Sequence, residues 1–478
     1  MQKTESALRE ILDATLEHAV SYLESLDTRS VAATAHLQTL RQHLEKPLTE
    51  GGIPVEQVID ELVRDVDGGL LGSAGGRLFG WVVGGSVPAA LAADWLTAAW
   101  DQNAALYATA PAAAVAEEVA GNWLKDLFGL PPQASFALVS GCQMAHVTCL
   151  AAARHALLAR QGWDVEERGL YGAPAIRIIS TAERHGTVER ALRLLGMGRG
   201  QVLDLPTDAQ ARLQPELLQK ALESLTPSTP TIVLLQAGDV NTGSCDPFEE
   251  LIPLAKRHDA WVHVDGAFGL WAAASPRYRH LVKGVQDADS WATDGHKWLN
   301  VPYDCGYAFV ADSASHHASL SHRAAYITHN ADARDEMDWN PEWSRRARGF
   351  PTYAALRELG RQGVAELVER CCRHAHAIVM GIGNLPGAEV VWEPTLNQGL
   401  VRFLDPNPGA AGEDHDRHTE EVIAAILKSG EAFFGGTTWR GRRAMRVSVC
   451  CWQTSDDDVK RTVNSVARVL RPNQKPGM

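Results

Sequence analysis

Three residues that can do covalent or acid–base chemistry follow apolar stretches in this chain of 478 residues. Lys297 lies in the run Thr293-Asp294-Gly295-His296-Lys297-Trp298, thirty-two residues after Asp265. Asp265 closes an apolar run of its own, and His185 follows the apolar run 176–180. A lysine amine forms an imine with an aldehyde, a buried carboxylate holds a proton on a ring nitrogen, and an imidazole can lie on a ring face.

These three groups together match what pyridoxal phosphate (PLP) requires of a protein. Lys297 would bind its aldehyde as a Schiff base, and Asp265 would keep the pyridine nitrogen protonated so that the ring withdraws electrons. Taken alone, Lys297 beside Trp298 could snorkel from a buried segment, and Asp265 could cap a turn. A buried carboxylate needs a cationic partner, however, and a pyridinium supplies one. For His185 the sequence leaves a solvated loop position equally open.

A phosphate-binding turn is predicted at Val139-Ser140-Gly141-Cys142-Gln143-Met144-Ala145, where a strand gives way to a helix. The free amides and the dipole of a helix N-terminus favour an anion. Three other motifs are set aside. The glycines of 196–200 follow a helix and not a strand. His316-His317 and His415–His418 lack the context of metal ligands and are predicted to be surface charge, so no metal site is expected. The acidic triplet 456–458 begins a helix and complements its dipole.

The elements that must position these residues alternate along the chain. Apolar strands are predicted at 136–140, 176–180, 231–237, 261–265 and 307–310, with helices such as 144–161 and 187–195 between them. This order is typical of an α/β fold with a mostly parallel sheet covered on both faces. Ligands bind at the carboxyl ends of such strands, where His185, Asp265 and Lys297 would all lie.

The remaining segments suggest three regions. Residues 1–95 form an N-terminal helical segment, with helices to about residue 66 that are interrupted near 49–54. Residues 96–375 form a large cofactor-binding domain, in which 311–350 is expected to be a long loop before a helix at 352–382. Residues 376–478 form a small α+β domain, because short strands near 389–392, 399–403 and 444–450 alternate with helices near 418–428 and 455–470.

Composition narrows the class of protein. A hydrophobic fraction of 45% with 22% charged residues is typical of a globular chain. The net charge of −13 argues against nucleic-acid and anionic-membrane partners. The N-terminus lacks the features of a signal peptide, and the apolar stretch 88–100 is too short to span a bilayer. Eight cysteines without a Cys-x-x-Cys pair predict buried thiols and a cytoplasmic location.

From about Phe79 to its C-terminus the chain resembles the group II PLP-dependent amino-acid decarboxylases, which include the aromatic amino-acid, histidine and glutamate decarboxylases. The matching motifs are His263-Val264-Asp265-Gly266-Ala267, His296-Lys297-Trp298-Leu299, Tyr303-Asp304-Cys305-Gly306, His185-Gly186-Thr187-Val188-Glu189-Arg190-Ala191 and Ala151-Ala152-Ala153-Arg154. The resemblance implies the aspartate-aminotransferase-like fold (fold type I), a homodimer with active sites at the subunit interface, and decarboxylation of an L-amino acid to an amine and CO₂.

The resemblance also implies roles for individual residues. Lys297 would hold the cofactor, Asp265 would face its ring nitrogen, and His185 and Ala267 would lie on opposite ring faces. The phosphate and its surroundings would be contacted by Cys142, Gln143, Thr293 and His296. Tyr326, in Ala324-Ala325-Tyr326-Ile327, resembles the family's tyrosine on a mobile loop, which protonates the substrate carbon after CO₂ leaves. Its presence favours simple decarboxylation.

The substrate is the least determined feature. Phe79, Trp81 and Tyr107 fall in segments that line the substrate pocket in relatives and suit an aromatic or bulky side chain, or they are ordinary core aromatics. Arg446 falls where relatives place an arginine that faces a carboxylate, and it could instead recognise an acidic substrate. Gln236 departs from the threonine common in relatives. Alternatives are a PLP-dependent aldehyde synthase, an aminotransferase or another PLP lyase, and a non-catalytic binding protein.

Overall fold

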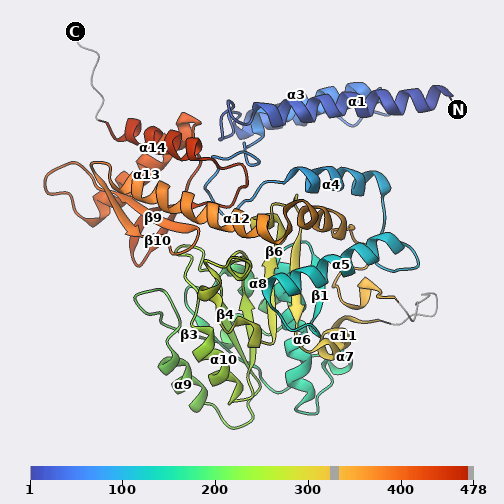
Figure 1. Cartoon of the computed structure of the whole chain (residues 1–478), viewed down its shortest axis with the longest axis vertical. Coiled ribbons are helices and arrows are strands. Elements are labelled where there is room, and N and C mark those ends of the chain that lie inside the picture. Colours follow the sequence, from blue (N-terminus) through green and yellow to red (C-terminus); the bar gives the residue numbers. More distant parts are fainter. Residues whose placement is uncertain (1, 323–332, 472–478) are drawn as a thin grey trace.

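The N-terminal helices form an arm that lies apart from the rest of the chain (Figure 1). The structure, a computed structural model, describes residues 2–322 and 333–471. The arm consists of α1 (Gln2–Ser25), α2 (Leu37–Leu44), α3 (Val55–Val66) and the short η1 (Asp67–Gly69). The gap between α2 and α3 confirms the break predicted near 49–54. No helix among the described residues is long and apolar enough to cross a membrane.

The large sheet has seven strands in the order β1-β7-β6-β5-β4-β2-β3. Only β7 runs antiparallel to its neighbours, so the mostly parallel sheet predicted from the sequence is confirmed. The bounds of β3 and β6 had not been predicted, because β3 is largely exposed and three of the five residues of β6 are polar. The strands are β1 (Ser135–Val139), β2 (Arg177–Thr181), β3 (Val202–Leu205), β4 (Thr231–Gln236), β5 (Trp261–Asp265), β6 (Ser290–Asp294) and β7 (Gly306–Val310).

Helices cover both faces of this sheet, as the continuous apolar strands require. Alternate residues of β1 show the division, because Phe136 and Leu138 join one core cluster while Ala137 and Val139 join the other. On the second face lie α6 (Cys142–Ala159), α7 (Val165–Arg168) and α8 (Gly186–Leu194). The first face is covered by α5 (Pro111–Phe128), α9 (Pro215–Glu223), α10 (Phe248–Lys256) and the 3₁₀ segment η3 (Gly269–Ala274).

The C-terminal residues form a small antiparallel sheet in the order β10-β11-β9-β8, which confirms the predicted α+β arrangement. Its elements are β8 (Ala388–Trp392), β9 (Gln398–Phe403), α13 (Gly412–Ser429), β10 (Gly435–Trp439), β11 (Arg442–Ser448) and α14 (Asp456–Leu470). The long α12 (Gly349–Gly383) connects it to the large sheet and packs against α4 (Pro88–Trp100) (Figure 1). The predicted domain limits at 95 and 375 fall inside α4 and α12, so the division itself stays a prediction.

Two predictions about residues 311–350 were wrong. The segment is not one long loop, because α11 (Ser313–Leu320), capped by Asp312, and the short η7 (Glu336–Asp338) interrupt it. His316 is not a surface charge but is fully buried. Its Nδ1 lies 2.8 Å from Ser135 Oγ, and its Nε2 lies 2.9 Å from the carbonyl oxygen of Trp339. The amphipathic pattern of α11 is too weak to reveal this in the sequence.

Candidate active site

Lys297 lies in a single π-helical turn, η6 (Gly295–Leu299), that directly follows β6. Such isolated turns occur frequently at functional sites. Lys297 Nζ is 3.0 Å from Asp294 Oδ2, and the two side chains are only 20% and 3% exposed. Burial alone would lower the pKa of Lys297, but Asp294 together with Cys142 and Asp265 outweighs burial and raises that pKa above its ordinary value. Lys297 therefore rests as an ammonium that donates to Asp294.

Two distant segments hold the lysine turn in place. The backbone of Gly84 passes so close that a Cβ atom there would lie 1.7 Å from the carbonyl oxygen of Lys297. Asn300, which ends the turn with φ 56°, donates from Nδ2 to the carbonyl oxygens of Trp298 (2.9 Å) and Cys450 (3.0 Å). The turn is thus fixed between the glycine-rich segment and the C-terminal residues.

Asp265 ends β5, beside β6 in the sheet, and is buried. The amide of Ala267 donates to Asp265 Oδ1 at 3.2 Å, and His146 Nε2 lies 3.6 Å from Oδ2. Burial raises the pKa of Asp265, but His146, and then His185 and Lys297, outweigh burial and hold the pKa well below its usual range. The group is therefore a stable carboxylate, suited to pair with a protonated ring nitrogen.

The predicted phosphate turn opens α6, where the amides of the first helical turn have no intrahelical partner. The amide of Cys142 donates to Asp294 Oδ1 at 2.6 Å, which joins this turn to the lysine turn. The Cys142 thiol faces His146 Nε2 at 3.5 Å, and burial keeps its pKa well above the usual value. Gln143 accepts a hydrogen bond from Arg190 at 3.5 Å. The small residues and the other amides at this helix N-terminus fit a phosphate group.

Thr293 and His296 lie on either side of Asp294 and Gly295 in the sequence. Thr293, on β6, is fully buried and donates from Oγ1 to the carbonyl oxygen of Ala267 at 3.4 Å. His296 Nδ1 accepts a hydrogen bond from the Cys305 amide at 3.2 Å, and its ring stacks on Tyr303 with centroids 4.2 Å apart. Burial lowers the pKa of His296, so the ring is neutral at neutral pH.

His185 is the N-cap of α8. Its Nδ1 accepts a hydrogen bond from the Thr187 amide at 3.3 Å, so Nε2 is the protonated nitrogen of the neutral ring. The residue is exposed, yet the surrounding protein displaces enough water to lower its pKa. The charges of Asp265 and Lys297 also act on its ring, which places all three predicted residues in one neighbourhood.

The predicted substrate residues occupy different environments. Phe79 has no exposed surface and stacks on Phe434 with centroids 5.4 Å apart, as a core aromatic does. Trp81 is 57% exposed and packs against Phe433 at 5.1 Å. The amide of Tyr107 donates to Asp335 at 2.9 Å.

Arg446, on β11, donates to the carbonyl oxygen of Val240 at 3.3 Å. Burial lowers its pKa, and its charge is close enough to act on His185. The predicted proton donor, Tyr326, lies outside the described residues.

Sequence reasoning gave no role to Asp294, His146 or His263. Asp294 was visible three residues before Lys297, a spacing that suits contact within one helical turn. His146 stands four residues after Cys142 on α6, and His263 stands two residues before Asp265 on β5, so each spacing places the pair on one face. Nothing in those patterns shows that the two histidines meet.

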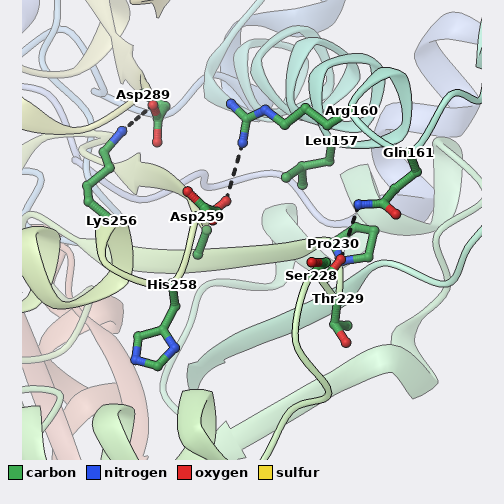
Figure 2. Close-up of a pocket in the computed structure, with 11 residues that line it drawn as sticks. Leu157, Arg160, Gln161, Ser228, Thr229, Pro230, Lys256, His258, Asp259 and Asp289 are labelled. Carbon is green, nitrogen blue, oxygen red and sulfur yellow. Dashed lines mark hydrogen bonds and ion pairs between the residues drawn. The ribbon is translucent and has the colours of Figure 1, made fainter.

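The structure shows two further arrangements that the sequence had not predicted: a pocket and a possible metal-ligand cluster. The pocket drawn in Figure 2 holds about 310 Å³ and includes Pro230, Ala260 and Asp289, which immediately precede β4, β5 and β6. It therefore lies at the opposite edge of the sheet from Asp265. Within the described residues, Cys142, His146 and Asp265 have possible metal-ligand atoms within 4.8 Å of one another. Cys142 and Asp265 of this group already belong to the predicted cofactor site.

Comparison with known proteins identifies the family. The family model described as "Pyridoxal-dependent decarboxylase conserved domain" matches residues 38–404. The chain is 24% identical over 453 residues to the aromatic-L-amino-acid decarboxylase of Bacillus atrophaeus, covering 94% of this chain and 92% of the relative. It is 28% identical over 396 residues to the L-2,4-diaminobutyrate decarboxylase of Rhizobium meliloti (strain 1021), covering 81% and 76%.

Among solved structures, that of Oryza sativa TDC with PLP and tryptamine superposes with a TM-score of 0.90 at 24% identity, over 97% of both chains. The fold is therefore that of the fold type I PLP enzymes, as predicted. Three groups lie at one edge of the sheet and fit the three parts of PLP. Lys297 fits the aldehyde, the carboxylate of Asp265 fits the ring nitrogen, and the helix N-terminus at Cys142 fits the phosphate. The chain belongs to the pyridoxal-dependent decarboxylase family, and it is an amino-acid decarboxylase whose cofactor is PLP.

Proposed function

We propose that this protein converts an L-amino acid with an aromatic or bulky side chain into the corresponding amine and CO₂. PLP, when bound, supplies an electron-withdrawing ring that stabilises the charge left when the carboxylate departs. The observation that carries the proposal is the pairing of an ammonium, Lys297, with a buried carboxylate, Asp294, beside the second buried carboxylate, Asp265.

The chain's own residues then have distinct tasks. The Lys297 ammonium donates to Asp294 Oδ2, which holds the side chain in place, and Lys297 would attack an aldehyde as the free amine once its proton has passed to solvent. Asp265 holds a proton at the ring nitrogen. His185 would cover one face of the ring and Ala267 the other. The phosphate is held by the turn at Cys142 and Gln143 together with Thr293 and His296, and Tyr326 protonates the substrate carbon.

The exposed indole of Trp81 and the adjacent Phe433 support an aromatic substrate, since they offer an apolar surface, and Trp81 lies in the same segment as Gly84, which contacts the lysine turn. The relative from Bacillus atrophaeus, named for aromatic amino acids, points the same way. Arg446 supports a second candidate, an acidic amino acid, because a cation beside His185 would suit a side-chain carboxylate.

A substrate panel tests both candidates. Purified protein loaded with PLP is incubated with L-tryptophan, L-tyrosine, L-DOPA, 5-hydroxytryptophan, L-glutamate, L-aspartate and L-2,4-diaminobutyrate, and amine, CO₂, aldehyde and ammonia are measured. Amine and CO₂ in equal amounts from an aromatic substrate are expected. Preference for an acidic substrate that Arg446→Gln abolishes would favour the second candidate, and aldehyde with ammonia would indicate an aldehyde synthase instead.

We further propose a homodimer with the active sites at the subunit interface. Leu8, Leu12, Leu16 and Val20 form a stripe at four-residue spacing on α1, each between 37% and 61% exposed. An apolar stripe of this kind on an extended arm requires a covering surface. Analytical ultracentrifugation should give twice the protomer mass, and Leu12→Glu with Leu16→Glu should shift the protein toward the monomer. A monomeric parent protein would refute the dimer.

A cytoplasmic location is also proposed. All eight cysteines are free, and all except Cys245 are buried, as suits a reducing compartment. Fractionation of the source cells should recover the protein with the cytoplasmic enzymes. Recovery from an extracellular or periplasmic fraction would contradict the proposal.

A further inference from the structure

Behind Asp265, a chain of polar groups runs through the core. His146 Nε2 lies 3.6 Å from Asp265 Oδ2, and His146 Nδ1 lies 2.9 Å from His263 Nε2. His263 Nδ1 lies 2.9 Å from Ser290 Oγ, which accepts a hydrogen bond from Trp261 Nε1 at 2.9 Å. None of the four residues behind Asp265 is more than 1% exposed. No step described so far uses the two histidines.

The groups at the two ends of this chain favour one direction for its hydrogen bonds. The Trp261 indole can only donate, and the ionised Asp265 can only accept. His146 Nε2 faces this carboxylate at 3.6 Å and the Cys142 thiol at 3.5 Å, so a proton on Nε2 suits the site. A neutral His146 of this tautomer accepts at Nδ1 from His263 Nε2. His263 Nδ1 in turn accepts from the Ser290 hydroxyl. Burial is the main cause that lowers the pKa of His263 to about 3, so His263 is neutral and can hold this tautomer.

We propose that His146 is a positioning residue that keeps Asp265 ionised and oriented, so that the proton shared with the cofactor stays on the ring nitrogen. His263 and Ser290 hold His146 in the tautomer that donates to Asp265. The physical reason is that a second donor stabilises the carboxylate relative to the carboxylic acid. Without that donor, the shared proton moves toward Asp265 and the ring loses its positive charge. The inference rests on the role proposed above for Asp265.

The alternative is that His146 is merely a satisfied core residue whose loss loosens the fold. Cofactor binding separates the two possibilities. Apoprotein is titrated with PLP and with its 1-deaza analogue, in which the ring nitrogen is replaced by CH, and both dissociation constants are measured by fluorescence. The parent should bind PLP more tightly than the analogue, because Asp265 would face an unpaired CH group in the analogue complex.

His146→Leu removes the donor and should weaken PLP binding by about tenfold or more, which corresponds to the lower end of the free energies of hydrogen bonds to charged groups. Binding of the analogue should be unchanged. His146→Gln should retain the preference for PLP, because its Nε2 can donate to Asp265 while its Oε1 accepts from His263. His316→Leu is the matched control, since it removes a fully buried histidine with two hydrogen-bond partners on another part of the sheet. It should change neither constant.

Equal losses for PLP and the analogue in His146→Leu, or no loss for either, would overturn the positioning role. A parent protein that shows no preference for PLP would instead overturn the proposed role of Asp265, so the two failures are distinguishable. Thermal unfolding of each apoprotein reports whether the variant folds. If His146→Leu does not fold, Ser290→Ala takes its place, because it removes one oxygen and releases the His263 tautomer. It should reduce the preference for PLP several-fold, and an unchanged preference would overturn the inference.

Discussion

Substituting Gly84 by alanine should displace the lysine turn without touching any predicted catalytic side chain. The new Cβ would lie 1.7 Å from the carbonyl oxygen of Lys297 and 3.1 Å from Asn300 Nδ2. An ordinary carbon–oxygen contact is about 3.3 Å, so one of the two backbones must move by about 1.6 Å. The turn cannot yield freely, because Asn300 ties it to Trp298 and Cys450.

A misplacement of about 1 Å can cost roughly 100-fold in rate, so Gly84→Ala should lower kcat/KM by about 100-fold or more. The assay is the initial rate of amine formation with PLP in excess, beside the absorbance of the bound cofactor. Gly200→Ala is the matched control, because a Cβ there meets nothing within 4 Å, and it should behave as the parent. Activity of Gly84→Ala within a few-fold of the parent would refute the packing of the glycine-rich segment on the lysine turn.

Three further predictions concern single groups. Asp265→Asn should still bind PLP but lose about 100-fold or more in kcat, because an amide cannot keep the ring nitrogen protonated; activity within a few-fold of the parent would make the aspartate structural. Tyr326→Phe should still release CO₂ but shift products from amine toward aldehyde, ammonia and peroxide, with oxygen consumed in step; equal amine without oxygen uptake would return protonation to His185. Burial lowers the pKa of His316 from 6.5 to about 3. Between these two pH values the unfolded chain binds more protons than the folded chain, so folding stability is lost as pH falls from 6.5 toward 3. The melting temperature of His316→Gln should therefore fall less steeply with acid, and equal slopes would contradict the assignment.

The alternation of apolar strands and helices was enough to predict the parallel sheet, because a strand buried on both faces must be continuously apolar. The same pattern placed Lys297, Asp265 and His185 at one sheet edge. It failed for α11, whose short sequence carries weak amphipathicity, and for β3, which is largely exposed.

Contacts between side chains from separate elements could not be predicted. His146 and His263 come from a helix and a strand that are far apart in the sequence, and no local pattern shows that their rings meet at 2.9 Å. The sequence places Asp294 only three residues before Lys297. Its simultaneous contact with Lys297 and the Cys142 amide, however, depends on how β6 and α6 pack. Local spacing shows which residues share a face, whereas tertiary packing decides which faces meet.

The most direct test of the account is to locate the covalent attachment of PLP. The holoenzyme is reduced with borohydride, digested and analysed by mass spectrometry. The account predicts a pyridoxyl group on Lys297 in the parent protein and none in Lys297→Ala, which should also lose nearly all decarboxylase activity. A pyridoxyl group on another lysine of the active parent protein, or turnover that survives in Lys297→Ala, would contradict it.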